Sequence, residues 1–312
     1  MSFSSEVKKE LTAIENAPCC SIAQSYGLLL FGRAFSKHEI SILTENSDVA
    51  AAYAKAVSIL SGISPDISVS DAGNFSVTLT DTKTINTIFE NLGIAGAAVK
   101  RRINFANIHD DCCFAAFMRG AFLSGGTVTD PSKEYHLEFS CPSKGLCDDL
   151  IKIFDETGEQ TEDASPITPK STLRNGSNIV YLKKSGEIED TLSFMGATES
   201  SMELMGAKMY KDVRNTVNRR VNFDNANIAR SANAAAKQYE AICIIRDRIG
   251  LDKLSDDLRL TAEARLDGME LSSAEIAAKL PGNLSVSGVN HRFKKLITMA
   301  DKIKEQQKGK IK

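Results

Sequence analysis

The chain has 312 residues, of which 42% are hydrophobic and 25% are charged. This composition is ordinary for a globular protein in water. No window approaches the roughly 18 unbroken apolar residues of a membrane helix, so we expect no membrane partner. The length exceeds that of a usual single core, which predicts two or three domains.

The charge is unevenly distributed along the chain. Residues 201–312 contain 21 Lys and Arg against 14 Asp and Glu, a net charge of +7. Residues 1–200 contain 17 against 26, a net charge of −9. A basic half of this kind suits a polyanionic partner, although a basic tail also serves solubility.

The start of the chain and its cysteines both indicate an intracellular protein. The first residues, MSFSSEVKKELTAIENA, read as a polar amphipathic helix without the apolar segment of a secretory signal. The seven cysteines form two adjacent pairs, Cys19–Cys20 and Cys112–Cys113, and three single residues, Cys141, Cys147 and Cys243. They have neither CxxC spacing nor a histidine cluster beside them. We therefore expect reduced, mostly buried packing thiols rather than a zinc site, a disulfide framework or a redox device.

One helix is written twice in the sequence. CCSIAQSYGLLLFGRAF, residues 19–35, aligns without a gap with CCFAAFMRGAFLSGGTV, residues 112–128. Each copy is followed by alternating apolar residues, at 38–46 and at 134–141, which predict strands. Further patterns predict helices at 48–63, 83–93, 144–158 and 187–197, and strands at 67–80, near 165–172 and at 177–184. Both units then read helix, two strands, helix, two strands, helix, which is a duplicated α+β module.

Two glycines recur at matching positions in the repeated helix. Gly27 and Gly120 lie inside apolar helices, where each glycine costs about 1 kcal/mol relative to alanine, so we expect the two helix backbones to approach closely there. Gly32 and Gly125 lie five residues later, and we expect each to end its helix in the left-handed conformation. The alternative is two unrelated core helices that happen to share small residues.

The middle of the chain carries a stripe of asparagines. In KDVRNTVNRRVNFDNANIARSAN, residues 211–233, helical spacing places asparagines 215, 218, 222 and 225 along one side and three valines on the other. Asparagine is a poor helix former, so the stripe asks for a reason. Contact of Arg214, Asn218, Arg219 and Asn222 with DNA is one, and satisfaction of polar groups between domains is the other. We interpret Arg101–Arg102, a weaker basic point, as a solvated loop.

The C-terminal segment has the pattern of a helix-turn-helix. In LSSAEIAAKL, Ser272 and Glu275 form a capping box, PGNL ends this helix, and Ser285 or Ser287 begins the next. At 100° per residue the second helix is apolar on one side and polar on the other. The apolar positions are Val289, Phe293, Leu296, Ile297 and Ala300. The polar positions are Ser287, Asn290, His291, Lys294 and Thr298, with Arg292 and Lys295 flanking them.

These polar residues are of the types that bind DNA in a major groove. Asn290 suits adenine, Arg292 or Lys294 suits guanine or phosphate, and the serines at the helix start suit phosphate. The alternative is a solvated face on a two-helix packing unit. The tail from Lys302 onward is expected to fray and to add nonspecific phosphate attraction at most.

No catalytic motif stands out in the chain. Walker A, GxGxxG and GxSxG patterns are absent, and the four histidines are far apart in sequence. Asp110 and Asp111 precede a helix and Asp130 lies in a VTDPS turn, so we give these acids structural roles.

SYGLLLFGR and MRGAFLSGG resemble degenerate copies of the LAGLIDADG motif, whose acidic residues bind a catalytic metal. In that register the acidic positions fall on Gly32 and Gly125, so both carboxylates are missing. With the asparagine-rich stretch and the C-terminal motif, nearly the entire chain is similar to the WhiA family, the sporulation and cell-division regulators of Gram-positive bacteria.

The resemblance implies a fold and a function. The fold is a duplicated LAGLIDADG-like (αββαββα) domain at 1–200, a helical linker at 201–235 and an all-α helix-turn-helix domain at 236–312. The function is sequence-specific transcriptional regulation on double-stranded DNA, in sporulation or in cell division and chromosome segregation. We expect a nucleoid-associated protein that is not an enzyme and has no cofactor or metal. The alternatives are a protein-interaction or ligand-sensing module with nonspecific DNA binding and, less favoured, a metal-dependent endonuclease.

Overall fold

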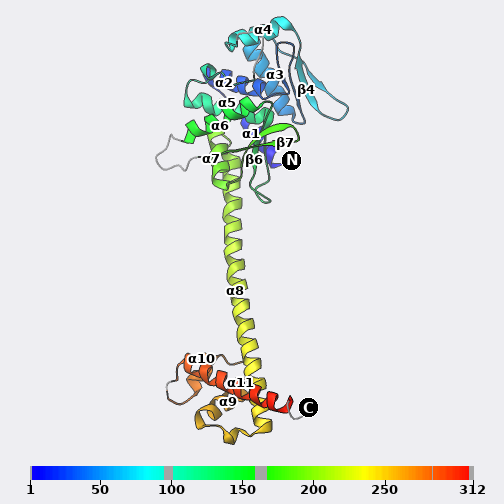
Figure 1. Ribbon diagram of the computed structural model, residues 1–312. Helices are drawn as coiled ribbons and strands as arrows, with labels where there is room; N and C mark the ends of the chain where they lie inside the picture. Colours follow the sequence, from blue (N-terminus) through cyan, green and yellow to red (C-terminus); the bar gives the residue numbers. More distant parts are fainter. Residues whose placement is uncertain (1, 95–100, 159–166, 283, 309–312) are drawn as a thin grey trace. The chain divides into compact units, whose positions relative to one another are not determined.

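The computed structural model describes residues 2–94, 101–158, 167–282 and 284–308 (Figure 1). The chain divides into two compact units, Met1–Asp212 and Val213–Lys312. Each unit is considered by itself. No helix in the described parts of either unit combines the length and the apolar character that crossing a bilayer requires.

The first unit contains the predicted module twice. Helix α1 (Phe3–Thr12) precedes both copies, and a short 3-10 helix, η1 (Phe105–Asn107), separates them. The first copy comprises α2 (Pro18–Leu30), β1 (Ala34–Phe35), β2 (Ile40–Thr44), α3 (Ser47–Ser61), β3 (Ile67–Val69), β4 (Phe75–Leu79) and α4 (Thr82–Asn91). The second comprises α5 (Asp111–Gly125), β5 (Gly126–Val128), β6 (Leu137–Cys141), α6 (Lys144–Gly158), β7 (Lys170–Arg174), β8 (Ser177–Leu182) and α7 (Ser185–Met195). The predicted αββαββα order is confirmed.

Each copy folds its strands into an antiparallel sheet with the same connectivity, β1-β2-β4-β3 and β5-β6-β8-β7. The predicted Asn-Gly turn joins β7 and β8, and Asn175 and Gly176 both have positive φ, 51° and 82°. A turn of this kind matches the twist of a two-stranded hairpin. The strand expected near 165–172 begins at Lys170, and residues 165 and 166 lie outside the described chain.

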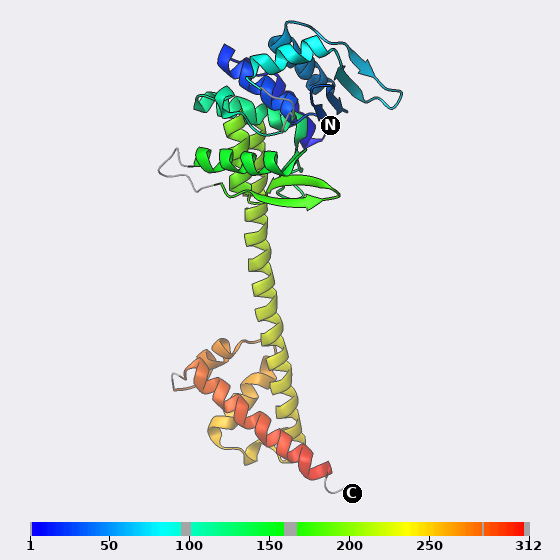
Figure 2. The same ribbon diagram turned by 45° about the horizontal axis from the view of Figure 1, so that its top comes forward.

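The two copies meet at α2 and α5, which lie side by side in both views (Figures 1 and 2). A Cβ atom on Gly27 would overlap the carbonyl oxygen of Phe117, and one on Gly120 would overlap that of Gln24. The added Cβ on Gly120 would also lie 2.8 Å from the backbone nitrogen of Leu28. The expected close approach of two helix backbones is confirmed, and it explains why glycine occupies both positions.

The left-handed conformation expected at Gly32 and Gly125 is wrong. Neither residue has a positive φ; Gly32 lies beyond the end of α2, and Gly125 is the last residue of α5. The reason for glycine is space. An added Cβ would lie 2.8 Å from the carbonyl oxygen of Ser41 at Gly32, and 2.7 Å from that of Ser140 at Gly125.

A long helix, α8 (Thr198–Arg248), contains the boundary between the two units. Its first turn is held by α1, because the Glu10 carboxylate accepts hydrogen bonds from the backbone N–H groups of Glu199 (2.7 Å) and Ser200 (3.0 Å). A carboxylate at a helix N-terminus satisfies free N–H groups and complements the helix dipole. Glu10 therefore anchors the start of α8 to the first unit.

The second unit is helical. After α8 come η2 (Leu251–Lys253), α9 (Asp256–Asp267), α10 (Ser273–Lys279) and α11 (Val286–Lys308). Its core contains Arg265, which is only 1% exposed. The guanidinium donates to the carbonyl oxygens of Gly268, Met269 and Leu271 and to the side chain of Gln238, and it lies 5.1 Å from the centre of the Phe293 ring. Arg265 thus fixes the loop between α9 and α10.

Candidate nucleic-acid interface

Helices α10 and α11 form the predicted helix-turn-helix. Ser272 Oγ accepts from the backbone N–H of Glu275 (3.2 Å), and the Glu275 carboxylate accepts from the N–H of Ser272 (2.7 Å), which confirms the capping box. Gly282 has a φ of 92° in the turn, a conformation that favours glycine. Ser285 Oγ then accepts from the N–H of Gly288 (3.2 Å), so Ser285, of the two serines considered, caps α11.

The two sides of α11 follow the predicted pattern. On the apolar side the side chains of Val289, Phe293, Leu296 and Ala300 are buried, and Ile297 is half-buried. The predicted polar positions are all exposed: Ser287, Asn290, His291, Lys294 and Thr298. The buried side joins the core of the second unit, so the polar side is the one available to a ligand.

Asn290 is tied to the first helix of the motif. The Ser273 hydroxyl, at the start of α10, donates a 2.8 Å hydrogen bond to Asn290 Oδ1. This bond orients an amide that remains exposed. An amide held in one orientation loses less conformational entropy when it binds a base edge.

The cationic residues of α11 fall into two groups. Arg292 is 18% exposed, and its guanidinium forms a 2.9 Å ion pair with Asp257 of α9. In this arrangement Arg292 links two helices of the domain. Lys294 and Lys295 are exposed, and neither forms an ion pair with any residue that the structure describes. These two lysines are therefore the free cations among the predicted contact residues of α11.

The asparagine stripe lies on α8 within the second unit. Arg214, Asn218, Arg219 and Asn222 are all exposed, and their side chains have no hydrogen-bond partner among the described residues. Val217 on the same helix is also exposed, at 54%. Contact of this stripe with DNA stays a prediction.

The solvated loop expected at Arg101 and Arg102 is wrong. Arg101 donates to the carbonyl oxygens of Gly32 (3.2 Å) and Arg33 (3.1 Å), beyond the end of α2. Arg102 donates twice to the carboxylate of Asp149 on α6, at 2.5 and 2.6 Å. Both arginines thus hold the first unit together.

Asp149 needs this partner because its side chain is only 2% exposed. Burial alone would raise its pKa, but hydrogen bonds from Arg102 and from the backbone N–H of Ile103, with the arginine charge, hold the pKa below its ordinary value. The sequence analysis missed this pair. The available signal was a single aspartate among the apolar positions of the helix at 144–158.

Comparisons with known proteins agree with the sequence and the fold. The model of the WhiA LAGLIDADG-like domain matches residues 114–214, and that of the WhiA C-terminal HTH domain matches residues 217–300. A probable cell division protein WhiA from Ruminiclostridium cellulolyticum is 34% identical over 98% of this chain and 99% of its own length. The chain belongs to the WhiA family. Another WhiA, from Lactobacillus helveticus, is 35% identical over 97% of this chain and 99% of its own.

A solved structure shows the same fold. The crystal structure of full-length DUF199/WhiA from Thermatoga maritima has a TM-score of 0.58 and 24% identity, and the match covers 97% of this chain and 99% of that one. The WhiA-family chain described here is thus a LAGLIDADG-like domain followed by a helical HTH domain.

In this WhiA-family chain the LAGLIDADG-like domain is a degenerate relative of the endonucleases. The C-terminal ends of α2 and α5 border a hollow lined by Phe31, Gly32, Arg33, Ile42, Leu43, Ser124, Gly125, Ser140, Cys141, Pro142, Gly176 and Ser177. No carboxylate is among these described residues, whereas Mg²⁺ prefers carboxylate oxygens. Asp111 begins α5 at its other end, and Asp130 accepts from the backbone N–H of Ser132 (2.8 Å), the structural roles predicted for them.

Proposed function

We propose that the chain is a sequence-specific DNA-binding transcriptional regulator that associates with the nucleoid and is not an enzyme. The curated relatives are named probable cell division proteins, and we extend that role, with chromosome segregation and sporulation where it occurs, to this chain. In this proposal residues 236–312 read the DNA, residues 201–235 form a helical linker, and residues 1–200 form the module without catalytic carboxylates.

The observation that carries the proposal is the exposed polar side of α11. A recognition helix contacts base edges with residues near its N-terminus, and here Ser287, Asn290, His291 and Lys294 lie in the first three turns. Asn290 suits an adenine edge, and Lys294 with Lys295 suits guanine or phosphate. The unit itself is basic, with 19 Lys and Arg against 12 Asp and Glu in residues 213–312.

The first test is the salt dependence of DNA binding by the full-length protein. Genome-wide mapping supplies the bound sequence, and fluorescence anisotropy then gives the affinity for it at several salt concentrations. We expect the Lys294→Ala/Lys295→Ala variant to flatten the slope of log affinity against log salt by about one unit per lost phosphate contact. Lys302→Ala is the matched control, because Lys302 is an exposed lysine further along α11. Equal slopes for the double variant and the wild type would remove α11 from the interface.

The second test separates sequence readout from nonspecific attraction. Asn290→Ala should cost about 1–3 kcal/mol at a single base pair and relax specificity there, while leaving the salt slope unchanged. Arg214→Ala/Arg219→Ala, on α8, should instead weaken binding to all sequences alike.

The alternative is an interaction or ligand-sensing module, in which the acidic residues 1–200 would bind a partner regulatory protein. That alternative predicts equal affinity of the wild type for the mapped and a scrambled sequence.

A further inference from the structure

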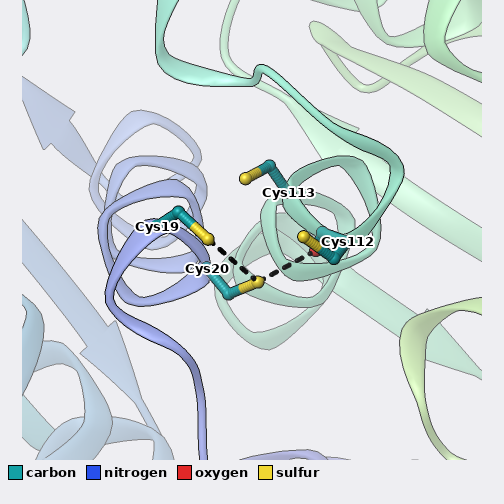
Figure 3. A group of neighbouring side chains, drawn as sticks. All are labelled: Cys19, Cys20, Cys112 and Cys113. Carbon is teal, nitrogen blue, oxygen red and sulfur yellow. Dashed lines mark hydrogen bonds between the residues drawn. The ribbon is translucent and has the colours of Figure 1, made fainter.

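The fold brings both cysteine pairs to one place. Cys19 and Cys20 are the second and third residues of α2, and Cys112 and Cys113 are the second and third residues of α5. The four Sγ atoms all lie within 4.8 Å of one another. Figure 3 shows the four side chains gathered between the beginnings of the two helices. We refer to these four residues as the cysteine cluster.

The spacing of the sulfur atoms suits a single metal ion. Zinc binds cysteine sulfur at about 2.3 Å in a tetrahedron, which places the sulfur atoms about 3.8 Å apart. The Sγ atoms of Cys19 and Cys20 are 3.9 Å apart. Since no pair is separated by more than 4.8 Å, none has to close by more than about 1 Å to reach the tetrahedral distance. An iron–sulfur cube binds each cysteine through a different iron and needs wider spacing.

The surroundings of the cluster favour a cation that is bound by thiolates. The first turns of both helices present backbone N–H groups and the positive end of the helix dipole, which stabilise negative sulfur. Hydrogen bonds from the thiols of Cys20 and Cys113 lower the pKa of Cys19, whereas burial raises the pKa of Cys20 to about 12. Full ionisation of the cluster at neutral pH therefore needs a bound cation to neutralise it.

The cluster is also reachable from solvent. Cys19 and Cys112 are exposed, while Cys20 and Cys113 are buried. One exposed and one buried ligand from each helix give an ion a route inward and a dry side on which to rest. Asp110, just before α5, adds negative charge near the entrance.

We propose that the cysteine cluster binds one Zn²⁺ ion as a structural tetrathiolate site that joins the two halves of the duplicated domain. With four protein ligands, zinc keeps no open position for substrate, so the ion would have no catalytic role. The site is at the starts of α2 and α5, whereas the carboxylate-free hollow lies at their C-terminal ends. It is therefore separate from the position of the lost nuclease metal.

The test uses the reduced full-length protein, stripped of metal and titrated with Co²⁺ and Zn²⁺. We expect one equivalent of Co²⁺ to give the intense visible absorption of tetrahedral cobalt and a sulfur-to-cobalt charge-transfer band, both lost on addition of one equivalent of Zn²⁺. Cys19→Ser/Cys112→Ser, which alters only the exposed ligands, should lose both signals. Cys243→Ser is the matched control, because this half-buried cysteine lies in the other unit and should leave them unchanged.

A second readout covers the case in which a variant folds poorly. In the wild type, bound Zn²⁺ should slow alkylation of the cysteine cluster and raise the melting temperature of the first unit, and a chelator should reverse both. Three outcomes would overturn the proposal: no cobalt signal from the reduced protein, unchanged signals in the double variant, or a disulfide within the cluster of freshly isolated protein that contains no metal.

Discussion

The contact between α2 and α5 makes a sharp prediction at Gly120. The Gly120→Ala substitution adds one methyl group where the obstacles are the carbonyl oxygen of Gln24 and the backbone nitrogen of Leu28. Backbone atoms of a helix cannot rotate away as a side chain does. The two helices must therefore separate, and contacts along their whole interface are loosened.

The magnitude follows from two opposing terms. Overpacking a core costs about 1–3 kcal/mol when side chains adjust, and a rigid backbone obstacle places this site at the upper end, about 3 kcal/mol. Alanine returns about 1 kcal/mol through its better helix propensity. The expected net loss is about 2 kcal/mol. For a unit of 212 residues this lowers the melting temperature by about 4–8 °C.

Differential scanning calorimetry of the full-length protein measures this shift. Gly206→Ala is the matched control, because Gly206 lies within α8 in the same unit and an added Cβ there meets nothing within 4 Å. The control should keep or raise the melting temperature. If Gly120→Ala melted at or above the temperature of the control, the helix backbones would not be in the contact described, and the explanation of both glycines would fail.

Three further substitutions test other contacts. Asp149→Asn should destabilise the first unit by about 2 kcal/mol at neutral pH, through the loss of charged hydrogen bonds. Because the folded pKa of Asp149 is lowered, the wild-type advantage is complete above about pH 4 and is lost as the pH falls through the folded value, so urea titrations should show the gap closing in acid. Ser272→Ala removes the capping box and should cost the second unit about 1 kcal/mol by calorimetry, with the salt slope of DNA binding unchanged. Arg265→Leu leaves three buried carbonyl groups without their donor, so the cooperative melting of the second unit should shift down by at least the equivalent of about 3 kcal/mol.

Each of these predictions has a contradicting result. A pH-independent gap for Asp149→Asn would mean that the carboxylate is not stabilised by its charge. An unchanged second transition in Ser272→Ala or Arg265→Leu would mean that the α9–α10 connection is held by other contacts.

The features that sequence reasoning recovered are those with a local physical signature. The αββαββα order follows from apolar periodicity and turn residues such as Asn175–Gly176. The two sides of α11 follow from helical spacing alone, and the capping box from Ser272 and Glu275, three residues apart. Even the close approach at Gly27 and Gly120 could be predicted, since glycine inside an apolar helix is costly without a compensating contact.

The features it missed depend on which distant segments meet. Nothing near Arg102 in the sequence identifies Asp149 as its partner, and the ion pair of Arg292 with Asp257 likewise joins different helices. The cysteines have no zinc-like spacing along the chain because each helix supplies only an adjacent pair. Their convergence arises from the pairing of two copies 93 residues apart, so the repeat of Cys–Cys in matching helices was the only signal.

The crowding around Gly32 and Gly125 bears on whether this module could return to cutting DNA. An aspartate at either position would need its first side-chain carbon where a strand carbonyl, of Ser41 or Ser140, already stands. Restoring the acids would therefore demand simultaneous displacement of β2 and β6. Any single step on that route lowers stability before it confers chemistry, which makes the loss a one-way evolutionary ratchet.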